Sequence, residues 1–300
     1  MVFVVAGEAL VDVVVPRDGT PRRTPGGSPL NVAVGLARLG VPTLLLTELG
    51  DDDAGDLVQR HLEDSGVSLG PGAVVTGRRT STATAHLDDA GAASYDFDIE
   101  WTLPASPLPA TATGLHVGSL GAALRPGRAA VVDLARQAVA AGVLVTFDPN
   151  ARPTLTPDAE QAWADVLEVA AQSDVVKLSD EDLHFLSPGT GPDAAAELLL
   201  ARGAQLVVVT LGGGGAAAYS AGADCRVSSR PVDVVDTVGA GDSFMAALVA
   251  VVVEHGLDGL DAGLLRGYVE AAHAAAAITV SRPGADPPRR ADLPAGWPLG

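Results

Sequence analysis

The chain has 300 residues, of which 47% are hydrophobic, and a formal net charge of −18. This apolar content provides a large core and excludes intrinsic disorder, so we expect one α/β domain over residues 1–300. The acidic balance disfavours nucleic acids and anionic membranes as partners. The apolar start carries Glu8 and Asp12 without a basic flank, which favours a strand over a signal peptide. The longest apolar run, residues 244–253, is too short to span a bilayer. With Cys225 as the only cysteine, these features predict a cytoplasmic protein.

Short apolar runs typical of buried strands alternate with helical patterns along the chain. The predicted strands cover residues 3–6, 43–47, 115–118, 143–147, 175–178 and 206–211. The predicted helices cover residues 30–39, 54–65, 128–141, 160–171, 193–202 and 243–255. This alternation indicates a parallel sheet covered by helices on both faces. The Pro-rich tail after Asp286 is expected to be an irregular surface segment.

Two regions interrupt this rhythm. Residues 10–15 continue the first strand, and residues 80–87 and 94–101 flank a turn signal, Asp88-Asp89-Ala90-Gly91. In the second arm apolar and acidic residues alternate, which gives a strand one apolar face. A lone hairpin is marginally stable in water, so this one is expected to cover a ligand cleft or a partner subunit. A plain edge hairpin is the alternative.

The most informative string is Asp236-Thr237-Val238-Gly239-Ala240-Gly241-Asp242-Ser243-Phe244, which opens the helical pattern of residues 243–255. The small residues Gly239, Ala240 and Gly241 leave N–H groups bare at the positive end of a helix, which suits an anion. The carboxylate of Asp242 follows directly. An anion cradle beside a base is what phosphoryl transfer to a hydroxyl needs. A small-residue turn with Asp242 as a capping acid is the alternative.

Together with a second motif, this string resembles the ribokinase-type (PfkB) carbohydrate kinases. The second motif is Gly26-Gly27-Ser28-Pro29-Leu30-Asn31-Val32-Ala33-Val34-Gly35-Leu36-Ala37-Arg38-Leu39-Gly40, and the resemblance runs from Val4 to about Pro288. It implies a doubly wound, mostly parallel sheet flanked by helices, with a small β-sheet lid at about residues 10–20 and 80–102. It also implies ATP and Mg²⁺ as cofactors and a sugar as substrate. In this family the lid closes over the sugar and in some members joins two subunits. The resemblance therefore allows a homodimer through the lid.

The resemblance implies that Asp242 is the general base and that Gly239, Ala240 and Gly241 hold the developing phosphate charge. It implies a sugar site formed by Asp12, Gly26, Gly27, Asn31 and Arg152. A missing Cβ lets the glycine backbone reach hydroxyls, and the Asn31 amide can both donate and accept a hydrogen bond. The alternative for Asp12 is an exposed acid on a strand.

On the nucleotide side, the resemblance implies contacts from Lys177, Thr210, Gly212, Gly215 and Gly241. The glycine run after Thr210 is equally typical of a flexible turn. The helical pattern at residues 270–278 and the following Ser281-Arg282-Pro283-Gly284-Ala285 resemble the adenine wall and the cation loop, although the helix alone fits a core helix as well.

Two acids resemble metal positions of the family. Asp236 is expected to help hold a monovalent cation such as K⁺. Asp182 is expected near Mg²⁺ through water, because Ser179 and Asp182 stand where relatives often have Asn-x-x-Glu. The acids 180–182 also fit an ordinary first helical turn capped by Ser179.

Four further strings resemble the fructokinase branch of the family. They are residues 7–12, 115–120, 147–153 and 176–181. The lid reads Tyr95-Asp96-Phe97-Asp98-Ile99-Glu100, and its charges would repel a sugar acid, so the predicted substrate is a neutral sugar, D-fructose, phosphorylated to fructose 6-phosphate. Trp101 stands where relatives commonly have small residues, which predicts an altered pocket.

Three alternatives stay open. The same scaffold serves ribokinases, nucleoside kinases and 2-keto-3-deoxygluconate kinases, and a silent sugar sensor could keep the fold. The intact Asp242 and its glycines argue against the sensor. A nicotinamide dehydrogenase is excluded, because the first strand–helix turn lacks Gly-x-Gly-x-x-Gly.

Overall fold

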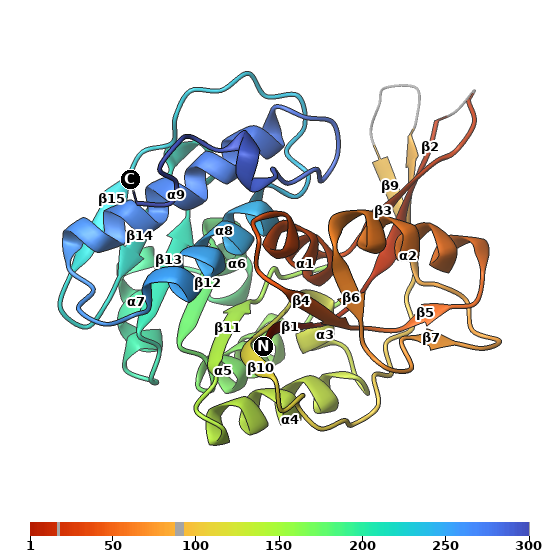
Figure 1. The fold of residues 1–300 in the computed structure, drawn as a ribbon, viewed down its shortest axis with the longest axis horizontal. Helices are drawn as coiled ribbons and strands as arrows, with labels where there is room; N and C mark the ends of the chain where they lie inside the picture. Colours follow the sequence, from red (N-terminus) through yellow and green to blue (C-terminus); the bar gives the residue numbers. More distant parts are fainter. Residues whose placement is uncertain (17–18, 88–92, 300) are drawn as a thin grey trace.

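The computed structural model describes residues 1–16, 19–87 and 93–299, and its centre is a mostly parallel sheet (Figure 1). Within these residues nine strands follow the order β15-β14-β13-β12-β11-β10-β1-β4-β6. Their bounds are β1 Val2–Ala6, β4 Thr43–Leu46, β6 Val67–Leu69, β10 Ala112–Gly118, β11 Leu144–Asp148, β12 Val175–Ser179, β13 Leu206–Thr210, β14 Ala216–Tyr219 and β15 Asp224–Val227. Strands β14 and β15 run antiparallel to their neighbours, and the other pairs are parallel. The predicted parallel sheet is confirmed, with strand ends shifted by one to three residues.

Helices cover both faces of the sheet. One face carries α1 Ser28–Arg38, α2 Asp53–Ser65, α8 Ala240–His255 and α9 Ala262–Val280. The other carries α3 Ser119–Ala123, α4 Arg128–Ala140, α5 Ala159–Ala170, α6 Asp180–Leu186 and α7 Pro192–Leu200. Because the helices lie on both sides of the sheet, the predicted doubly wound fold is confirmed.

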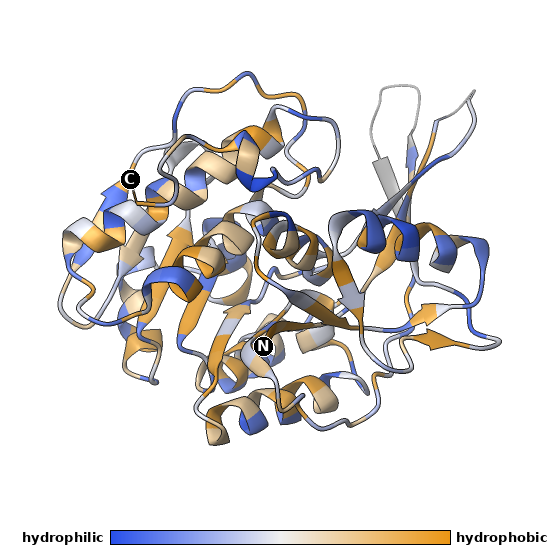
Figure 2. Ribbon diagram, viewed as in Figure 1, coloured by the Kyte–Doolittle hydropathy of each residue, from blue (hydrophilic) through white to orange (hydrophobic). Residues whose placement is uncertain are grey.

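Burial explains the character of individual helices. Helix α8 is apolar on nearly all sides, since every residue from Asp242 to Val252 is buried against the sheet, α1 and α9. Helix α2 is amphipathic and lies at the surface, where Figure 2 shows its polar colour beside the apolar strands. It begins after Asp52, whose carboxylate accepts a hydrogen bond from the Gly55 N–H at 2.8 Å, and ends at Gly66 in the left-handed region.

A separate four-stranded sheet, the lid sheet, stands beside the main body in the order β3-β2-β8-β9. Its strands are β2 Leu10–Val15, β3 Arg22–Gly26, β8 Thr82–Leu87 and β9 Ala93–Asp98. The predicted continuation of the first strand and both hairpin arms are confirmed, while the turn signal at residues 88–91 lies outside the described residues. Strand β3 was not predicted, because it is polar and contains Pro25. Proline is tolerated there since β3 is an edge strand. A short parallel pair, β5 Leu49–Gly50 and β7 Val74–Val75, completes the strands.

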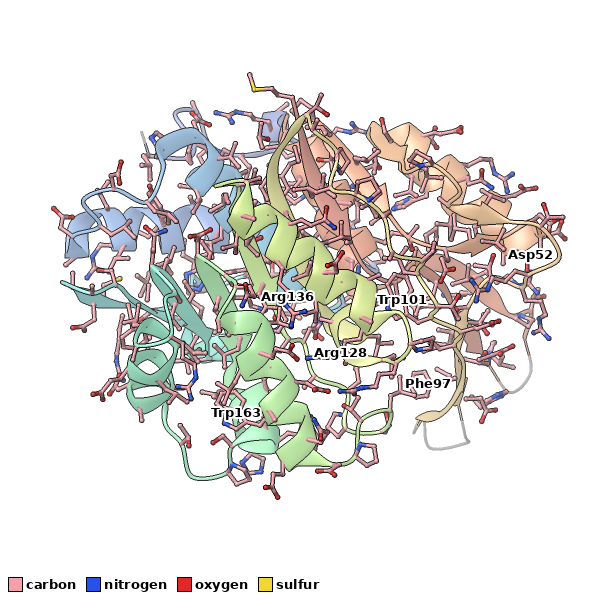
Figure 3. All side chains as sticks on the ribbon, turned by 90° about the horizontal axis from the view of Figure 1, so that it is seen from below. Asp52, Phe97, Trp101, Arg128, Arg136 and Trp163 are labelled. Carbon is pink, nitrogen blue, oxygen red and sulfur yellow. The ribbon has the colours of Figure 1, made fainter. Side chains whose placement is uncertain are left out.

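Two expectations about surface segments are corrected. Strand β9 ends at Asp98, and Trp101 beyond it packs against Gly127 at the start of α4 (Figure 3). Its indole donates to the carbonyl of Gly121 in α3 at 3.0 Å. Trp101 is 4% exposed and anchors the lid return in the core. Its expected effect on the pocket stays a prediction. The tail after Asp286 is not only surface, because Trp297 is buried and donates to the Ala271 carbonyl at 3.0 Å.

Candidate active site

The candidate site lies at the carboxyl ends of the central strands. Strand β1 pairs with β10 on one side and β4 on the other, so the connections diverge there, which is where doubly wound folds bind ligands. The two described non-glycine residues with positive φ, Ser119 and Asn150, follow β10 and β11 at this edge. Such backbone strain clusters at functional sites, which strengthens the assignment of this edge.

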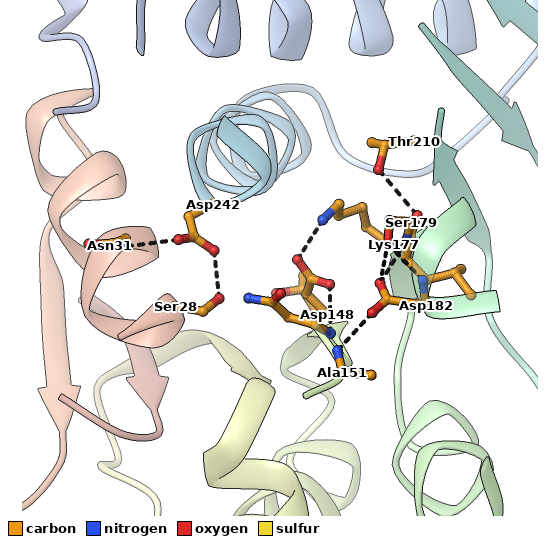
Figure 4. A network of polar contacts seen from close by, with 12 residues as sticks. Ser28, Asn31, Asp148, Ala151, Lys177, Ser179, Asp182, Thr210 and Asp242 are labelled. Carbon is orange, nitrogen blue, oxygen red and sulfur yellow. Dashed lines mark hydrogen bonds and ion pairs between the residues drawn. The ribbon is translucent and has the colours of Figure 1, made fainter. Parts of the chain in front are cut away.

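Asp242 is held at the start of α8 by two side chains of α1. The Ser28 hydroxyl donates to Oδ1 at 2.6 Å and the Asn31 amide donates to Oδ2 at 2.8 Å (Figure 4). Asp242 is only 8% exposed, so these bonds fix the direction of its carboxylate. The donor of Asn31, expected to meet a sugar, is thus used by Asp242. Ser28 was not singled out as a site residue, although it lies in the first motif.

The N-terminus of α8 is suited to an anion. Gly239 precedes the helix at φ 75°, and a Cβ there would lie 2.5 Å from Cβ of Ala285, so glycine is required. No side chain caps the helix. The Ala240 N–H donates to the Thr237 carbonyl, which places the N–H groups of Gly241 and Asp242 ahead of the first intrahelical bond. These two groups, rather than that of Ala240, are oriented for an anion.

Asp236 braces this turn. Its Oδ1 accepts from the Val238 N–H at 3.0 Å, and its Oδ2 accepts from the Gly284 N–H at 2.9 Å. The carboxylate therefore ties the loop before α8 to the loop after α9. Its contact with a monovalent cation stays a prediction.

On the lid sheet, Asp12 of β2 lies over Gly26 at the end of β3. A Cβ on Gly26 would fall 2.0 Å from Asp12 Oδ2, so the glycine makes room for this carboxylate. Burial raises the pKa of Asp12 to about 6, with nearby Asp242 adding to the rise and Arg152 opposing it. The structure thus brings Asp12, Gly26, Asn31 and Asp242 together. Arg152 is exposed, and its guanidinium donates to the Asn150 side chain at 2.7 Å.

Glu8, which was not predicted as a site residue, is buried beside the substrate turn. Its carboxylate accepts from the Gly121 N–H at 2.7 Å, and its own carbonyl would lie 2.8 Å from a Cβ on Gly27, whose φ is 102°. Burial raises the pKa of Glu8 to about 7, against the opposing hydrogen bonds from Ser119 and Gly121. Glu8 therefore links the start of α3 to the turn that precedes α1.

Replacing Glu8 with Gln should stabilise the protein at pH 8. The pKa rises from 4.5 to about 7 on folding, so the native state binds the proton more tightly and loses stability as pH rises through 7. That cost is about 3 kcal/mol at pH 8 and is absent at pH 4. Urea unfolding of E8Q and the parent should therefore give a higher midpoint for E8Q at pH 8 and matching midpoints at pH 4. A parent whose stability does not fall between pH 5 and pH 8 would contradict the assignment.

The expected nucleotide residues lie at the ends of β12 and β13. Gly212 has φ 51° and no atom within 4 Å of a Cβ position, whereas a Cβ on Gly215 would meet the Val227 carbonyl at 2.0 Å. Gly215 is thus required by the turn into β14. Thr210 ends β13 beside Ser179, and the Lys177 ammonium is buried against Asp148, with 2.7 Å between Nζ and Oδ2. Nucleotide contact by these residues stays a prediction.

Asp182 has a structural role that the alternative interpretation anticipated. It forms a capping box with Ser179, accepting from the Ser179 N–H and hydroxyl at 2.8 Å each, and it accepts from the Ala151 N–H at 2.7 Å. Among the described residues there is no group of three or more His, Cys, Asp or Glu that could hold a metal. Contact of Asp182 with Mg²⁺ through water stays a prediction.

Comparisons with known proteins identify related families and structures. A model of the family described as "pfkB family carbohydrate kinase" matches residues 3–292. A fructokinase of Rhizobium leguminosarum bv. trifolii is 37% identical over 257 residues, covering 81% of this chain and 77% of its own. A Vibrio cholerae fructokinase double mutant, solved with fructose, ADP and potassium, is 30% identical with a TM-score of 0.82, covering 95% and 94% of the two chains. Aminoimidazole riboside kinase of Salmonella enterica, solved with its riboside and an ATP analogue, is 28% identical with a TM-score of 0.78 and covers 94% of each chain.

No helix in the described part of the chain is long and apolar enough to cross a membrane.

Proposed function

The chain belongs to the pfkB family of carbohydrate kinases, and we propose that it transfers the γ-phosphate of ATP to D-fructose, forming fructose 6-phosphate. The observation that carries this proposal is the placement of Asp242. Ser28 and Asn31 fix its carboxylate at the first turn of α8. The N–H groups of Gly241 and Asp242, which precede the first intrahelical bond, lie in the same turn. A hydroxyl seated between Asp12 and Asp242 would meet a base and an anion site together.

In this mechanism Asp242 accepts the proton of the attacking sugar hydroxyl while the oxygen of that hydroxyl forms a bond to the γ-phosphorus of ATP. The bond from that phosphorus to the bridging oxygen of ADP breaks in the same displacement. The N–H groups at the start of α8 stabilise charge on the transferred phosphoryl group. Gly239, at φ 75°, keeps those N–H groups directed outward.

Magnesium would arrive with ATP and supply charge neutralisation on the phosphates, since Mg²⁺ usually keeps several waters and few protein ligands. The described residues fit this indirect mode and do not offer a cluster for direct ligation. We propose that Asp182 contacts this Mg²⁺ through a water molecule. For a monovalent cation we propose Asp236, because it joins the loops before α8 and after α9.

A neutral sugar fits the charges around the site. The lid strand β9 carries Asp96 and Asp98, and Glu100 follows it. Arg79 pairs with Asp98 at 2.9 Å and Arg78 with Glu100 at 2.8 Å, so these acids would repel a sugar acid less strongly than the sequence alone predicts. Arg152, the natural carboxylate partner, donates instead to the Asn150 carbonyl and side chain. The relatives named fructokinase support fructose. The similarity to aminoimidazole riboside kinase keeps a riboside as the second candidate substrate.

A cavity of about 250 Å³ lies beside the loop of Asn150 and Arg152 and has mostly apolar walls from α3 and α5. Asp12, Asn31 and Asp242 do not line it. We therefore place the sugar between the lid sheet and α8, not in this cavity.

The proposal is tested by coupled ADP release from Mg·ATP with fructose, ribose, glucose, 2-keto-3-deoxygluconate and aminoimidazole riboside. The ratio of kcat/KM values between substrates decides among them. We expect a large preference for fructose. A preference for the riboside would select the second candidate, and a preference for the sugar acid would refute the argument from lid charge. Sugar-independent ATP hydrolysis alone would contradict both.

Asp12 should make fructose binding depend on pH. With a pKa of about 6 in the free protein, its carboxylate is mostly protonated at pH 5 and loses acceptor capacity for sugar hydroxyls. Because only the ionised fraction is competent, KM for fructose should rise about 10-fold between pH 7 and pH 5. The dependence should vanish in Asp12→Asn, measured as KM against pH. If KM for fructose changes with pH in Asp12→Asn as it does in the parent, another titrating group causes the dependence.

A further inference from the structure

Lys177 is a buried ammonium whose hydrogen-bonding capacity is only partly used. Its side chain is 5% exposed and that of its partner Asp148 is 1% exposed, with 2.7 Å between Nζ and Oδ2. An ammonium has three donors, and Asp148 takes one of them. A buried charge is costly unless it is well paired, so a buried ammonium with unused donors needs a physical explanation.

The ammonium lies directly under the first turn of α8. A Cβ built on Gly241 would be 3.3 Å from Lys177 Nζ, so nothing larger than glycine separates them comfortably. Figure 4 shows the side chain of Lys177 reaching from β12 toward Asp148 and the helix that carries Asp242. The charge therefore lies beside Gly241 and within electrostatic reach of Asp242.

The carboxylates around Lys177 favour the protonated form of its side chain. Burial disfavours its ammonium, but Asp148 on β11, Asp182 on α6 and Asp242 on α8 outweigh this effect and raise the pKa of Lys177. Burial, with the Lys177 charge adding to it, lowers the pKa of neighbouring His116 to about 3, so His116 is neutral.

Two further groups bear on this charge balance. Asp12, on the lid sheet, faces Asp242 from the other side. His116 places Nδ1 3.0 Å from the Thr146 hydroxyl, and its Nε2 is a buried atom without a partner in the described residues. The charge of Lys177 is therefore balanced by Asp148, Asp182 and Asp242, which all act on its ammonium.

Resting on the proposed function, we infer that Lys177 is a positioning residue for phosphoryl transfer. Paired with Asp148, it supplies fixed positive charge beneath α8 that supports the anion bound by the Gly241 and Asp242 N–H groups. It does so through Gly241 and Asp242, without contacting the nucleotide. A fixed charge of this kind requires no reorganisation when the phosphoryl group moves.

The test is the neutral pair K177M/D148N, because Lys177→Met alone would leave Asp148 buried without a counter-charge. The matched control is R128M/E168Q, which neutralises a pair between α4 and α5 on the opposite face, where 2.8 Å separates the charged groups. We expect K177M/D148N to lose about 10²-fold in kcat, with the Kd for ADP changed less than threefold. The control should keep the parent values.

A structural ion pair predicts a different result. If K177M/D148N folds and keeps the parent kcat, the inference is wrong. If its Kd for ADP rises 10-fold or more while kcat at saturation is kept, Lys177 contacts the nucleotide and the inference is equally wrong. The single variant D148N, which keeps the ammonium, should lose less than 10-fold in kcat.

A second measurement separates this inference from the proposed function. Titration of ADP with Mg²⁺ and aluminium fluoride, which mimics the transferring phosphoryl group, needs no knowledge of the sugar. The fluoride complex should tighten ADP binding in the parent and not in K177M/D148N. If the parent phosphorylates none of the sugars, the proposed function fails, and the inference about Lys177 still stands or falls on this titration. Equal tightening in both proteins would overturn it.

Discussion

Replacing Asp242 with Asn is expected to lower kcat for sugar phosphorylation by about 10²–10⁴-fold. The amide cannot take the hydroxyl proton, yet it fills the same space at the start of α8. The Ser28 hydroxyl, 2.6 Å from Oδ1, can still donate to the amide oxygen. The Asn31 amide, which donates to Oδ2 in the parent, can turn its oxygen to accept from the new NH2 group, so the side chain should keep its place. ADP binding should therefore stay within about threefold of the parent, measured by calorimetry beside the coupled kinetic assay.

The matched control for D242N is Asp56→Asn. Asp56 is an exposed acid in the first turn of α2, so it tests the loss of a helix N-terminal charge without the base. D56N should keep the parent kcat. If D242N keeps a kcat within 10-fold of the parent, Asp242 is not the base, and the alternative interpretation of this acid as a helix-capping residue gains support.

Asp242 also shows what the sequence could and could not predict. The string at residues 236–244 predicts an acid beside a helix N-terminus, because that arrangement is local. The contact with Ser28 spans 214 positions and depends on α1 and α8 packing side by side. Asn31 was therefore predicted as a site residue with a different partner, and Ser28 was missed.

The same division holds for the fold. Buried strands β11 to β13 are continuous apolar runs, and their alternation with helices is visible in the chain. Strand β3 has no such pattern, since its hydrogen bonds to β2 decide its conformation. Trp101 fits the alternation of the hairpin arm, but its indole packs against Gly127, where a Cβ would lie 2.5 Å from the indole nitrogen, and this long-range contact is not visible in the sequence.

Lys177 and Asp148 illustrate a third limit. Asp148 ends β11, Lys177 lies in the middle of β12, and both lie in strings that resemble the fructokinase branch. Their pairing follows from the neighbouring placement of β11 and β12, which a single sequence does not specify. The strand order in space converts two separate polar residues into one buried charge pair.

Replacing Gly26 with Ala is expected to prevent Asp12 from binding the sugar, although Asp12 itself is unchanged. The new Cβ would lie 2.0 Å from Asp12 Oδ2 and 2.8 Å from its Cγ, so the carboxylate must turn away. The collision is with the end of a side chain, and Gly26 has no positive φ, so the fold should survive. A displacement of this size can cost about 10²-fold. We expect that loss in kcat/KM for fructose, mainly through KM.

Gly222→Ala is the matched control, because a Cβ there meets no atom within 4 Å and its φ is not positive, and it should be silent. The decisive comparison is a double-mutant cycle with Asp12→Ala. If Gly26 acts by making room for the Asp12 carboxylate, adding G26A to D12A should cost less than threefold, although G26A alone costs far more. Additive losses would mean that the Gly26 backbone itself meets the sugar, as the family resemblance implied. The cycle therefore distinguishes two physical reasons for one glycine, room for a neighbouring acid or access for the substrate.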